Sequence, residues 1–398
     1  MILSNKALKQ FVIGAVRETE PTPMRCQHAD ECGGCAFQDR AYEAQLAVKT
    51  RALQQIWDEA LPGLAPEPLA VVASPEPFGY RTRMDYAANR WRMGLRRSGK
   101  FNWVVDLSEC HLIPPSSFAA IRAVYDRSVE LGLRDYNLRS HQGFTRYFVV
   151  RRSPQGTLML AVVTASREHA AEMEQLAQVA LAQEHVVSFH WLLNDRLTDL
   201  SWGDSIQHWG QELLPMQVGQ RSLDIGPNTF FQNNIFLLGP LLDDVAAACD
   251  LGAGLPSVAD LYGGVGTISL HLADSASRVV TVEEFGESSA LAQRNIQQNG
   301  VANVQAVHAD TLAYLKDQVP GAFDVVVVDP PRIGLGEDVC RELVRIAPKR
   351  LVYVSCNPIT QVVDIPVLLK GFRLAELRGY DMFPQTPHLE SLAILDRI

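Results

Sequence analysis

The chain has 398 residues, of which 47% are apolar and 20% are charged, and its formal net charge is −9. This composition excludes a disordered chain, and the negative net charge excludes a protein that binds nucleic acid over its whole surface. No apolar run approaches the roughly 20 residues of a membrane-spanning helix, and no secretory signal is visible. We therefore expect a cytoplasmic protein of two or three domains, with no membrane contact and no evident obligate protein partner.

The first segment, residues 1–65, contains three of the seven cysteines within the stretch CQHADECGGC, together with a predicted helix. Clustered cysteines in a reducing compartment bind metal or carry out chemistry more often than they form disulfides. A structural site needs a fourth ligand, and Cys110 remains once the cysteines of the C-terminal half are set aside. Four thiolates allow either zinc or an iron–sulfur cluster. The candidate ligands are Cys26, Cys32, Cys35 and Cys110.

Residues 66–225 predict an α+β domain built mainly on antiparallel sheet. Short runs such as TRYFVVRRS and TLMLAVVTA are rich in β-branched and aromatic residues and are separated by Gly, Pro, Ser or Asn. One helix is expected in this region, near residues 168–183. The domain also contributes Cys110 to the predicted metal site.

Positive charge is concentrated in this central domain. Residues 80–152 contain 14 Lys or Arg and 6 Asp or Glu, although the whole chain is acidic. Between Tyr80 and Trp103, basic residues alternate with aromatic ones, including Tyr86, Trp91 and Phe101. Cations attract phosphates and aromatic rings stack on unpaired bases, so this segment predicts an RNA-binding surface. The alternative is a solvated sheet face whose aromatic residues lie in the core.

Residues 226–398 predict a doubly wound, parallel α/β sheet of the Rossmann-like class. Apolar runs in SVADLY, RVVTVEE, VQAVHAD, FDVVVVD and RLVYVSC alternate with helical segments, after a first helix expected over residues 235–249. Ligands in such sheets bind beyond the carboxyl ends of the strands, where the strand order reverses. Those ends carry, in chain order, Asp260, Glu283, Asp310, Asp329 and Cys356.

The first strand leads into the glycine-rich turn DLYGGVGTISL, where Tyr262 and Gly264 are candidate cofactor contacts. The turn lacks the third glycine of a dinucleotide fingerprint. Asp260 before it would repel a pyrophosphate but favour the ammonium group of S-adenosylmethionine. Glu283 is placed to accept from both ribose hydroxyls, and Asp310 could accept from the adenine amino group or simply cap a helix.

The last two strand ends supply a carboxylate and a thiol. The prolines after Asp329 in DPPRIG stiffen that turn. Cys356, in VSCNP, stands at a strand end in the predicted cleft, a position that favours a nucleophile. Cys249 and Cys340 fall within predicted helices and are interpreted as inert, buried residues.

Five motifs together, in order and spacing, resemble the RNA uracil-C5 methyltransferases that make 5-methyluridine. These motifs are FFQNN (residues 230–234), DLYGGVGTISL, DPPRIG, SCNP and DMFPQTPHLE. The resemblance extends to the cysteine stretch and so covers nearly the whole chain. The family usually has Cys where this chain has Gly263, which predicts altered packing of the turn with activity retained.

The resemblance implies a class I S-adenosylmethionine-dependent methyltransferase domain and a covalent mechanism. Cys356 would add to C6 of uracil, C5 would take the methyl group, and Glu390 would remove the C5 proton. Gln232 would bind the amino-acid end of the cofactor, Phe231 would line the pocket, and Asp329 would meet the uracil or the sulfonium. The target base would have to flip out of folded RNA.

The resemblance also favours a [4Fe–4S] cluster over zinc at the four cysteines, and 23S rRNA as the substrate. Only 25 residues precede Cys26, which favours the branch without an N-terminal β-barrel. The tRNA branch generally lacks the cysteine cluster, so a tRNA enzyme is the alternative. A 5-methylcytosine enzyme, a radical enzyme and a non-catalytic RNA-binding or assembly protein are remoter alternatives.

Overall fold

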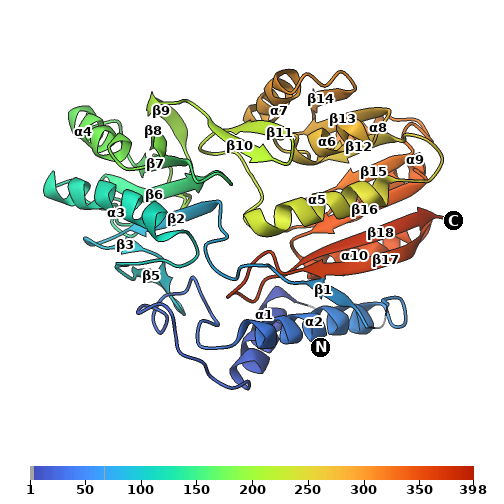
Figure 1. The fold of residues 1–398 in the computed structure, drawn as a ribbon, viewed down its shortest axis with the longest axis horizontal. Coiled ribbons are helices and arrows are strands. Elements are labelled where there is room, and N and C mark those ends of the chain that lie inside the picture. The colour runs from blue at the N-terminus through green and yellow to red at the C-terminus, as the bar shows by residue number, and fades with distance from the viewer. Residues whose placement is uncertain (1–3, 67) are drawn as a thin grey trace.

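The computed structural model describes residues 4–66 and 68–398, which form an N-terminal helical segment, a central domain and a C-terminal domain (Figure 1). No helix in this part of the chain is both long and apolar enough to cross a bilayer. The central domain lies on one side of the molecule and the C-terminal domain on the other, with the N-terminal helices α1 and α2 beneath the latter.

The C-terminal domain is built on an eight-stranded sheet with the order β1-β17-β18-β16-β15-β12-β13-β14. The five strands β12 to β16 are parallel, whereas β18 is antiparallel to both of its neighbours. The strands are β1 (Ala70–Val72), β12 (Ser257–Leu261), β13 (Arg278–Glu283), β14 (Val304–His308), β15 (Val325–Val328), β16 (Arg350–Ser355), β17 (Phe372–Tyr380) and β18 (Glu390–Arg397). The parallel strands confirm the predicted doubly wound arrangement.

Helices cover both faces of this sheet. One buried cluster joins α1, α2, α8, α9 and α10 to one face, and another joins α5, α6, α7 and the hairpin β10–β11 to the other. The elements are α1 (Asn5–Arg17), α2 (Tyr42–Ala60), α5 (Ile235–Cys249), α6 (Thr267–His271), the 3₁₀ turn η1 (Leu272–Asp274), α7 (Gly286–Gln298), α8 (Thr311–Lys316), α9 (Gly336–Ile346), α10 (Pro358–Leu368), β10 (Leu214–Val218) and β11 (Arg221–Ile225). The predicted helix over residues 235–249 is α5.

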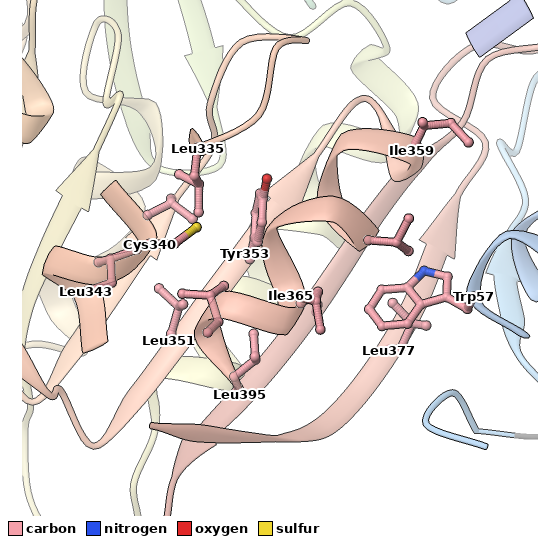
Figure 2. Close-up of a cluster of buried hydrophobic side chains, with 14 of the residues drawn as sticks. Trp57, Leu335, Cys340, Leu343, Leu351, Tyr353, Ile359, Ile365, Leu377 and Leu395 are labelled. Carbon is pink, nitrogen blue, oxygen red and sulfur yellow. The ribbon is translucent and has the colours of Figure 1, made fainter. Parts of the chain in front are cut away.

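Figure 2 shows part of the first cluster, in which Trp57 of α2 lies near Leu377 of β17. Cys340 is fully buried there, and Cys249 is buried on the opposite face, as predicted for inert cysteines. Helix α2 therefore belongs to the hydrophobic core of the C-terminal sheet, although most strands of that sheet lie in the second half of the chain.

The central domain has a six-stranded sheet with the order β3-β2-β6-β7-β8-β9, and a two-stranded ribbon of β4 and β5. All strand pairs are antiparallel except β7–β8, which α4 connects. The elements are β2 (Arg83–Ala88), β3 (Met93–Gly94), β4 (Arg96–Arg97), β5 (Lys100–Val104), α3 (Pro115–Glu130), β6 (Thr145–Arg152), β7 (Leu158–Thr164), α4 (Ala170–Leu181), β8 (Val186–Leu193) and β9 (Asp204–Gly210).

The expectation of a single helix in this region is wrong, because α3 packs beside α4 on the same buried cluster. The buried face of α3 includes Ser117, Ala120 and Ser128. The same face also carries Phe118, Ile121, Val124 and Tyr125 at helical spacing, so a sequence signal for this helix was present and was missed. The N-terminal segment likewise has two helices, α1 and α2, where one was expected.

Candidate functional site

The strand order reverses at β12, which lies between β13 on one side and β15 on the other. The carboxyl ends of β12 and β15 therefore flank the crevice where α/β sheets bind ligands. Asp260 stands near the end of β12, and Asp329 directly follows β15. The two predicted carboxylates thus meet at the switch point of the sheet.

A pocket of about 510 Å³, partly open to solvent, lies at this point. Its walls come from the stretch before α5, from α5 itself and from the glycine-rich turn after β12. Five of the predicted cofactor residues line it: Phe231, Gln232, Tyr262, Gly264 and Asp329. Gln232 Nε2 donates a hydrogen bond of 2.9 Å to Asp329 Oδ2, which connects the two sides of the pocket.

Asp260 lies fully buried beneath the turn. Its Oδ2 accepts hydrogen bonds from the backbone N–H (3.1 Å) and the hydroxyl (2.6 Å) of Ser269 in α6. Its Oδ1 is buried without a hydrogen-bond partner among the described residues. Burial raises the pKa of Asp260 to about 7, and burial together with the charge of Asp260 raises that of Asp329. A cationic ligand would stabilise both carboxylates.

Glu283 and Asp310 extend the row of acids beyond the pocket lining. Glu283 accepts hydrogen bonds from the backbone N–H groups of Gly264 (2.9 Å) and Phe285 (2.7 Å), so it braces the glycine-rich turn. Asp310 is exposed and caps the N-terminus of α8 by accepting from Ala313 N at 2.8 Å. Helix capping is the alternative role that the sequence allowed for Asp310. The capping bond uses Oδ1 and leaves Oδ2 outside it.

Cys356 and Glu390 lie at the ends of adjacent strands. Cys356 directly follows β16, Glu390 begins β18, and the partnered residues Ser355 and Ser391 are their chain neighbours. Burial, followed by the charges of Glu390 and Asp329, raises the pKa of the Cys356 thiol to about 12. Burial and the charge of Asp329 also raise the pKa of Glu390, whose Oε1 is buried without a hydrogen-bond partner among the described residues.

Arg332, within DPPRIG, is a site residue that the sequence reasoning did not single out. It lowers the pKa of both Cys356 and Glu390, against the effects of burial and of the neighbouring acids. Its backbone carbonyl accepts a 2.8 Å hydrogen bond from Asn357 Nδ2, which joins the DPPRIG turn to the start of α10. A single cation among motifs whose other charged residues are mainly acidic was the sequence signal that could have identified Arg332.

The loop that leads to Glu390 is anchored to the N-terminal segment. Asp381 forms a fully buried ion pair of 2.6 Å with Lys49 of α2. Gln385 exchanges two hydrogen bonds of 3.2 Å with Gln45 of α2, and its carbonyl accepts from Ala36 N at 2.7 Å. Because Ala36 directly follows the cysteine stretch, that stretch and the Glu390 loop are in direct contact.

His388 lies in the same loop. Burial, and then nearby cations beginning with Arg332, lower its pKa to about 4. Its ring packs edge-on against Phe383, with the centroids 6.1 Å apart. The imidazole is therefore neutral at physiological pH.

The four predicted metal ligands line one small cavity, whose remaining walls are mainly apolar and include Leu95, Leu107 and Leu112. All four are free thiols. Burial raises their pKa values, to about 11 for Cys32 and about 12 for Cys35. The stretch CGGC lies directly against β4, since Gly33 N donates to Arg96 O at 2.8 Å.

Four cysteine thiols around one cavity can hold a zinc ion or an iron–sulfur cluster. Tetrahedral zinc with Zn–S bonds of about 2.3 Å would bring its four sulfurs within about 4 Å of one another. Among the described residues, no three of the four cysteine sulfurs lie within 4.8 Å of one another. The group that does meet this limit is Cys26, Glu109 and His111.

The predicted RNA segment divides between core and surface. Tyr80 and Tyr86 are fully buried, so they cannot stack on bases, whereas Trp91 and Trp103 are 49% and 38% exposed. The side chain of Phe101 lies outside the described part of the structure.

A broad groove runs beside the cysteine stretch to the Glu390 loop. Cations outnumber acids along it: Lys9, Arg17, Arg81, Arg83 and Arg96 against Asp30 and Asp85.

Comparisons with known proteins agree over nearly the whole chain. A family model described as tRNA (Uracil-5-)-methyltransferase matches residues 211–398. An uncharacterized RNA methyltransferase of Nitratidesulfovibrio vulgaris is 33% identical, over 93% of this chain and 82% of its own length. The tRNA (uracil(54)-C(5))-methyltransferase of Pyrococcus furiosus is 32% identical, over 94% of this chain and 85% of its own length.

A solved structure is similar in the same range. The crystal structure of Pyrococcus abyssi tRNA (uracil-54, C5)-methyltransferase with S-adenosyl-L-homocysteine has a TM-score of 0.80 and 30% identity. It covers 94% of this chain, which in turn covers 86% of it.

Proposed function

The chain belongs to the RNA uracil-5-methyltransferase family and is an S-adenosylmethionine-dependent enzyme, and we propose that it methylates C5 of a tRNA uridine. The first candidate is the uridine that corresponds to position 54, the position named for the Pyrococcus enzymes. The observation that carries the proposed mechanism is the convergence of Cys356, Glu390 and Asp329 beside the pocket at the switch point.

In the proposed reaction, the Cys356 thiolate adds to C6 of the flipped uracil, and the electrons displaced from the C5–C6 bond make C5 nucleophilic. Bound S-adenosylmethionine supplies the methyl group. The Glu390 carboxylate then removes the proton from C5, the C5–C6 double bond re-forms and the pair of the C6–S bond returns to sulfur. The raised pKa of Glu390 makes its carboxylate, once ionised, a stronger base than an ordinary glutamate.

Arg332 has two proposed roles in this sequence. It stabilises the thiolate form of Cys356 before the addition and again after the sulfur leaves. It also faces Glu390, whose charged form it favours. Without this cation, three neighbouring acidic groups would oppose one another's ionisation.

The pocket residues are proposed to hold the cofactor in the orientation that the strand ends impose. Asp260 and Asp329 would meet its positive charges, because both carboxylates are buried and in need of a cation. Gln232 would bind its amino-acid end, Phe231 would pack against it, and Glu283 would accept from its ribose once released from Gly264.

The preference for tRNA replaces the expectation of 23S rRNA. That expectation depended on the cysteine stretch as a mark of rRNA enzymes. Relatives named as tRNA methyltransferases match 94% of this chain, so at most about 24 residues lie outside the match. Similarity to tRNA enzymes over this share of the chain favours tRNA as the substrate.

For the cysteine cavity we propose a [4Fe–4S] cluster held by the four thiolates, with zinc as the alternative. The wide spacing of the sulfurs and the apolar walls support the cluster. Its proposed role is structural: it would fix the CGGC stretch, and through Ala36 the loop that leads to Glu390. Iron and zinc analysis of the purified protein, with absorbance near 400 nm, distinguishes the two metals.

The decisive experiment is mass spectrometry of RNA incubated with the protein and S-adenosylmethionine. Unmodified tRNA and 23S rRNA fragments would be offered in parallel. We expect 5-methyluridine in tRNA and none with the Cys356→Ala protein. Detection of 5-methyluridine only in 23S rRNA would overturn the substrate assignment. Its formation by both the wild-type and the Cys356→Ala proteins would overturn the role of Cys356.

A further inference from the structure

A second pocket is lined entirely by residues of the central domain. Figure 1 shows this domain beside the C-terminal sheet, with β3 and β5 on its far side. The pocket measures about 960 Å³, including the solvent at its mouth. Three turns form it: the β2–β3 turn, the β4–β5 turn with β5, and residues 137–139. None of its lining residues belongs to the site of Cys356 and Glu390, so any ligand here is separate from the target uridine.

The lining carries three cations and no acid. Arg90, Lys100 and Arg139 come from the three different turns, and their side chains form no ion pair among the described residues. Cations without acidic partners, gathered from separate turns, create a local positive potential. A ligand that carries a phosphate fits this potential.

An aromatic ring and amide side chains complete the pocket. Trp103 of β5 lines it and is 38% exposed, and the Arg92 guanidinium lies 4.4 Å from its ring centroid. Asn89 and Asn102 line the pocket beside it. An exposed indole offers a stacking surface to any base, and amides can hydrogen-bond to base edges.

The β2–β3 turn adopts a backbone that its residues disfavour. Arg90 and Trp91 have φ values of 55° and 60°, and Asn89 N donates to Arg92 O across the turn at 3.0 Å. Two-residue turns of this kind strongly favour Asn-Gly, because the left-handed region is costly for larger residues. Half-buried Asp135 holds the turn by accepting a 2.6 Å hydrogen bond from Trp91 N.

The strained β2–β3 turn forms part of the pocket wall. Backbone strain maintained by neighbouring groups is concentrated at functional sites. Here it fixes Arg90 on the pocket wall and leaves Trp91 49% exposed next to it.

We propose that this pocket binds an unstacked nucleotide of the substrate RNA at a distance from the target uridine. Its phosphate lies among Arg90, Lys100 and Arg139, and its base lies against Trp103. A protein partner fits less well, since apart from Trp103 the one large apolar side chain in the lining is Leu138. The inference rests on the proposed RNA substrate and adds a second point of attachment to it.

The test measures affinity for an unmodified tRNA transcript at several salt concentrations. Lys100→Glu and Arg139→Glu should each weaken binding and reduce the slope of log K against log salt by about one. Trp103→Ala should weaken binding about fivefold or more while leaving that slope unchanged, because stacking releases no counterions. Trp103→Phe, which keeps a ring, should retain most of the affinity, and circular dichroism verifies folding.

The control is Lys370→Glu, the same charge change on an exposed lysine of the C-terminal domain. The maximal methylation rate at saturating tRNA should be unchanged in Lys370→Glu. The proposal is overturned if Lys100→Glu weakens binding no more than Lys370→Glu, or if Trp103→Ala binds like the wild type.

The two proposals fail separately. Methylation of tRNA with unchanged binding by the pocket variants would reject the pocket alone. Binding that follows the expected pattern, with no methylation of tRNA, would instead reject the proposed substrate and keep the pocket.

Discussion

The ion pair between Lys49 and Asp381 provides a sharp test of how the Glu390 loop is held. Both side chains are fully buried, their N–O distance is 2.6 Å, and Lys49 Nζ also donates to the carbonyl of Phe383 at 3.0 Å. Replacing Lys49 with Met keeps the aliphatic volume but removes the charge and both hydrogen bonds. Asp381 would then be a buried carboxylate without its cation.

Removing one partner of a buried ion pair costs about 3–5 kcal/mol, because the remaining charge is uncompensated. Replacing both partners with apolar residues of similar volume is often close to neutral. We therefore expect Lys49→Met to be strongly destabilising and Lys49→Met/Asp381→Leu to recover much of the loss. The exposed Lys6→Met in α1 should change stability by no more than about 0.5 kcal/mol.

Hydrogen exchange read by mass spectrometry suits this protein, since several domains need not unfold in one transition. If the affected region opens as a unit, 3–5 kcal/mol corresponds to about 150- to 5,000-fold faster exchange in α2 and residues 381–390. Exchange in α4, in the central domain, should be unchanged. A Lys49→Met protein that exchanges like the wild type, or a double variant less stable than the single one, would refute the reasoning.

Three further predictions concern the reactive groups. Arg332→Met should raise the pKa of the Cys356 thiol, and Glu390→Gln should lower it. Alkylation of this thiol by iodoacetamide, followed by peptide mass spectrometry, should therefore need a higher pH in Arg332→Met and a lower pH in Glu390→Gln. Glu390→Gln should also trap a covalent RNA adduct, seen as a slow gel band, whereas normal turnover would exclude Glu390 as the base. The pKa of Asp260, about 7 against an ordinary value near 4, means that its contribution to stability is full below pH 4 and is lost as the pH rises through 7. Cofactor binding should therefore release protons near pH 7, and the affinity should increase from pH 6 to pH 8. Calorimetry in two buffers of different ionisation enthalpy should show this proton release in the wild type and a smaller release in Asp260→Asn.

The site at the switch point was predictable because its residues follow strands with strong, continuous apolar patterns. Parallel strands place their carboxyl ends on one edge, so the order of β12 to β16 alone brings Asp260, Asp329 and Cys356 together. The alternation of aromatic and basic residues, in contrast, did not show which aromatic rings are exposed. Tyr80 and Tyr86 alternate with arginines as an RNA surface would, yet both are buried. Tyr86 of β2 packs edge-on against Phe118 of α3, and the Tyr80 hydroxyl, before β2, donates a hydrogen bond to the carbonyl of Pro384.

The anchoring of the Glu390 loop was not predictable for a different reason. Periodicity reports whether a segment is buried but not what buries it. Gln45 and Gln385 are 340 positions apart, and neither belongs to a pattern that names the other. Lys49, a fully buried lysine in a helix, gave no sign in sequence of its distant carboxylate. Arg332 was missed because it follows two prolines in a turn, where no period applies.

The departure at Gly263 from the usual family cysteine is best understood as one half of a pair. A Cβ atom at position 263 would lie 1.9 Å from Thr281 Oγ1 and 3.2 Å from Asp260 Oδ2. Thr281 is the direct neighbour of Asp260 across β12 and β13, and its hydroxyl is buried without a hydrogen-bond partner among the described residues. The threonine thus occupies the space that a side chain at 263 would need. A side chain at 263 therefore requires Thr281 to rotate its hydroxyl away or to be replaced by a smaller residue, so the two positions are coupled beside Asp260.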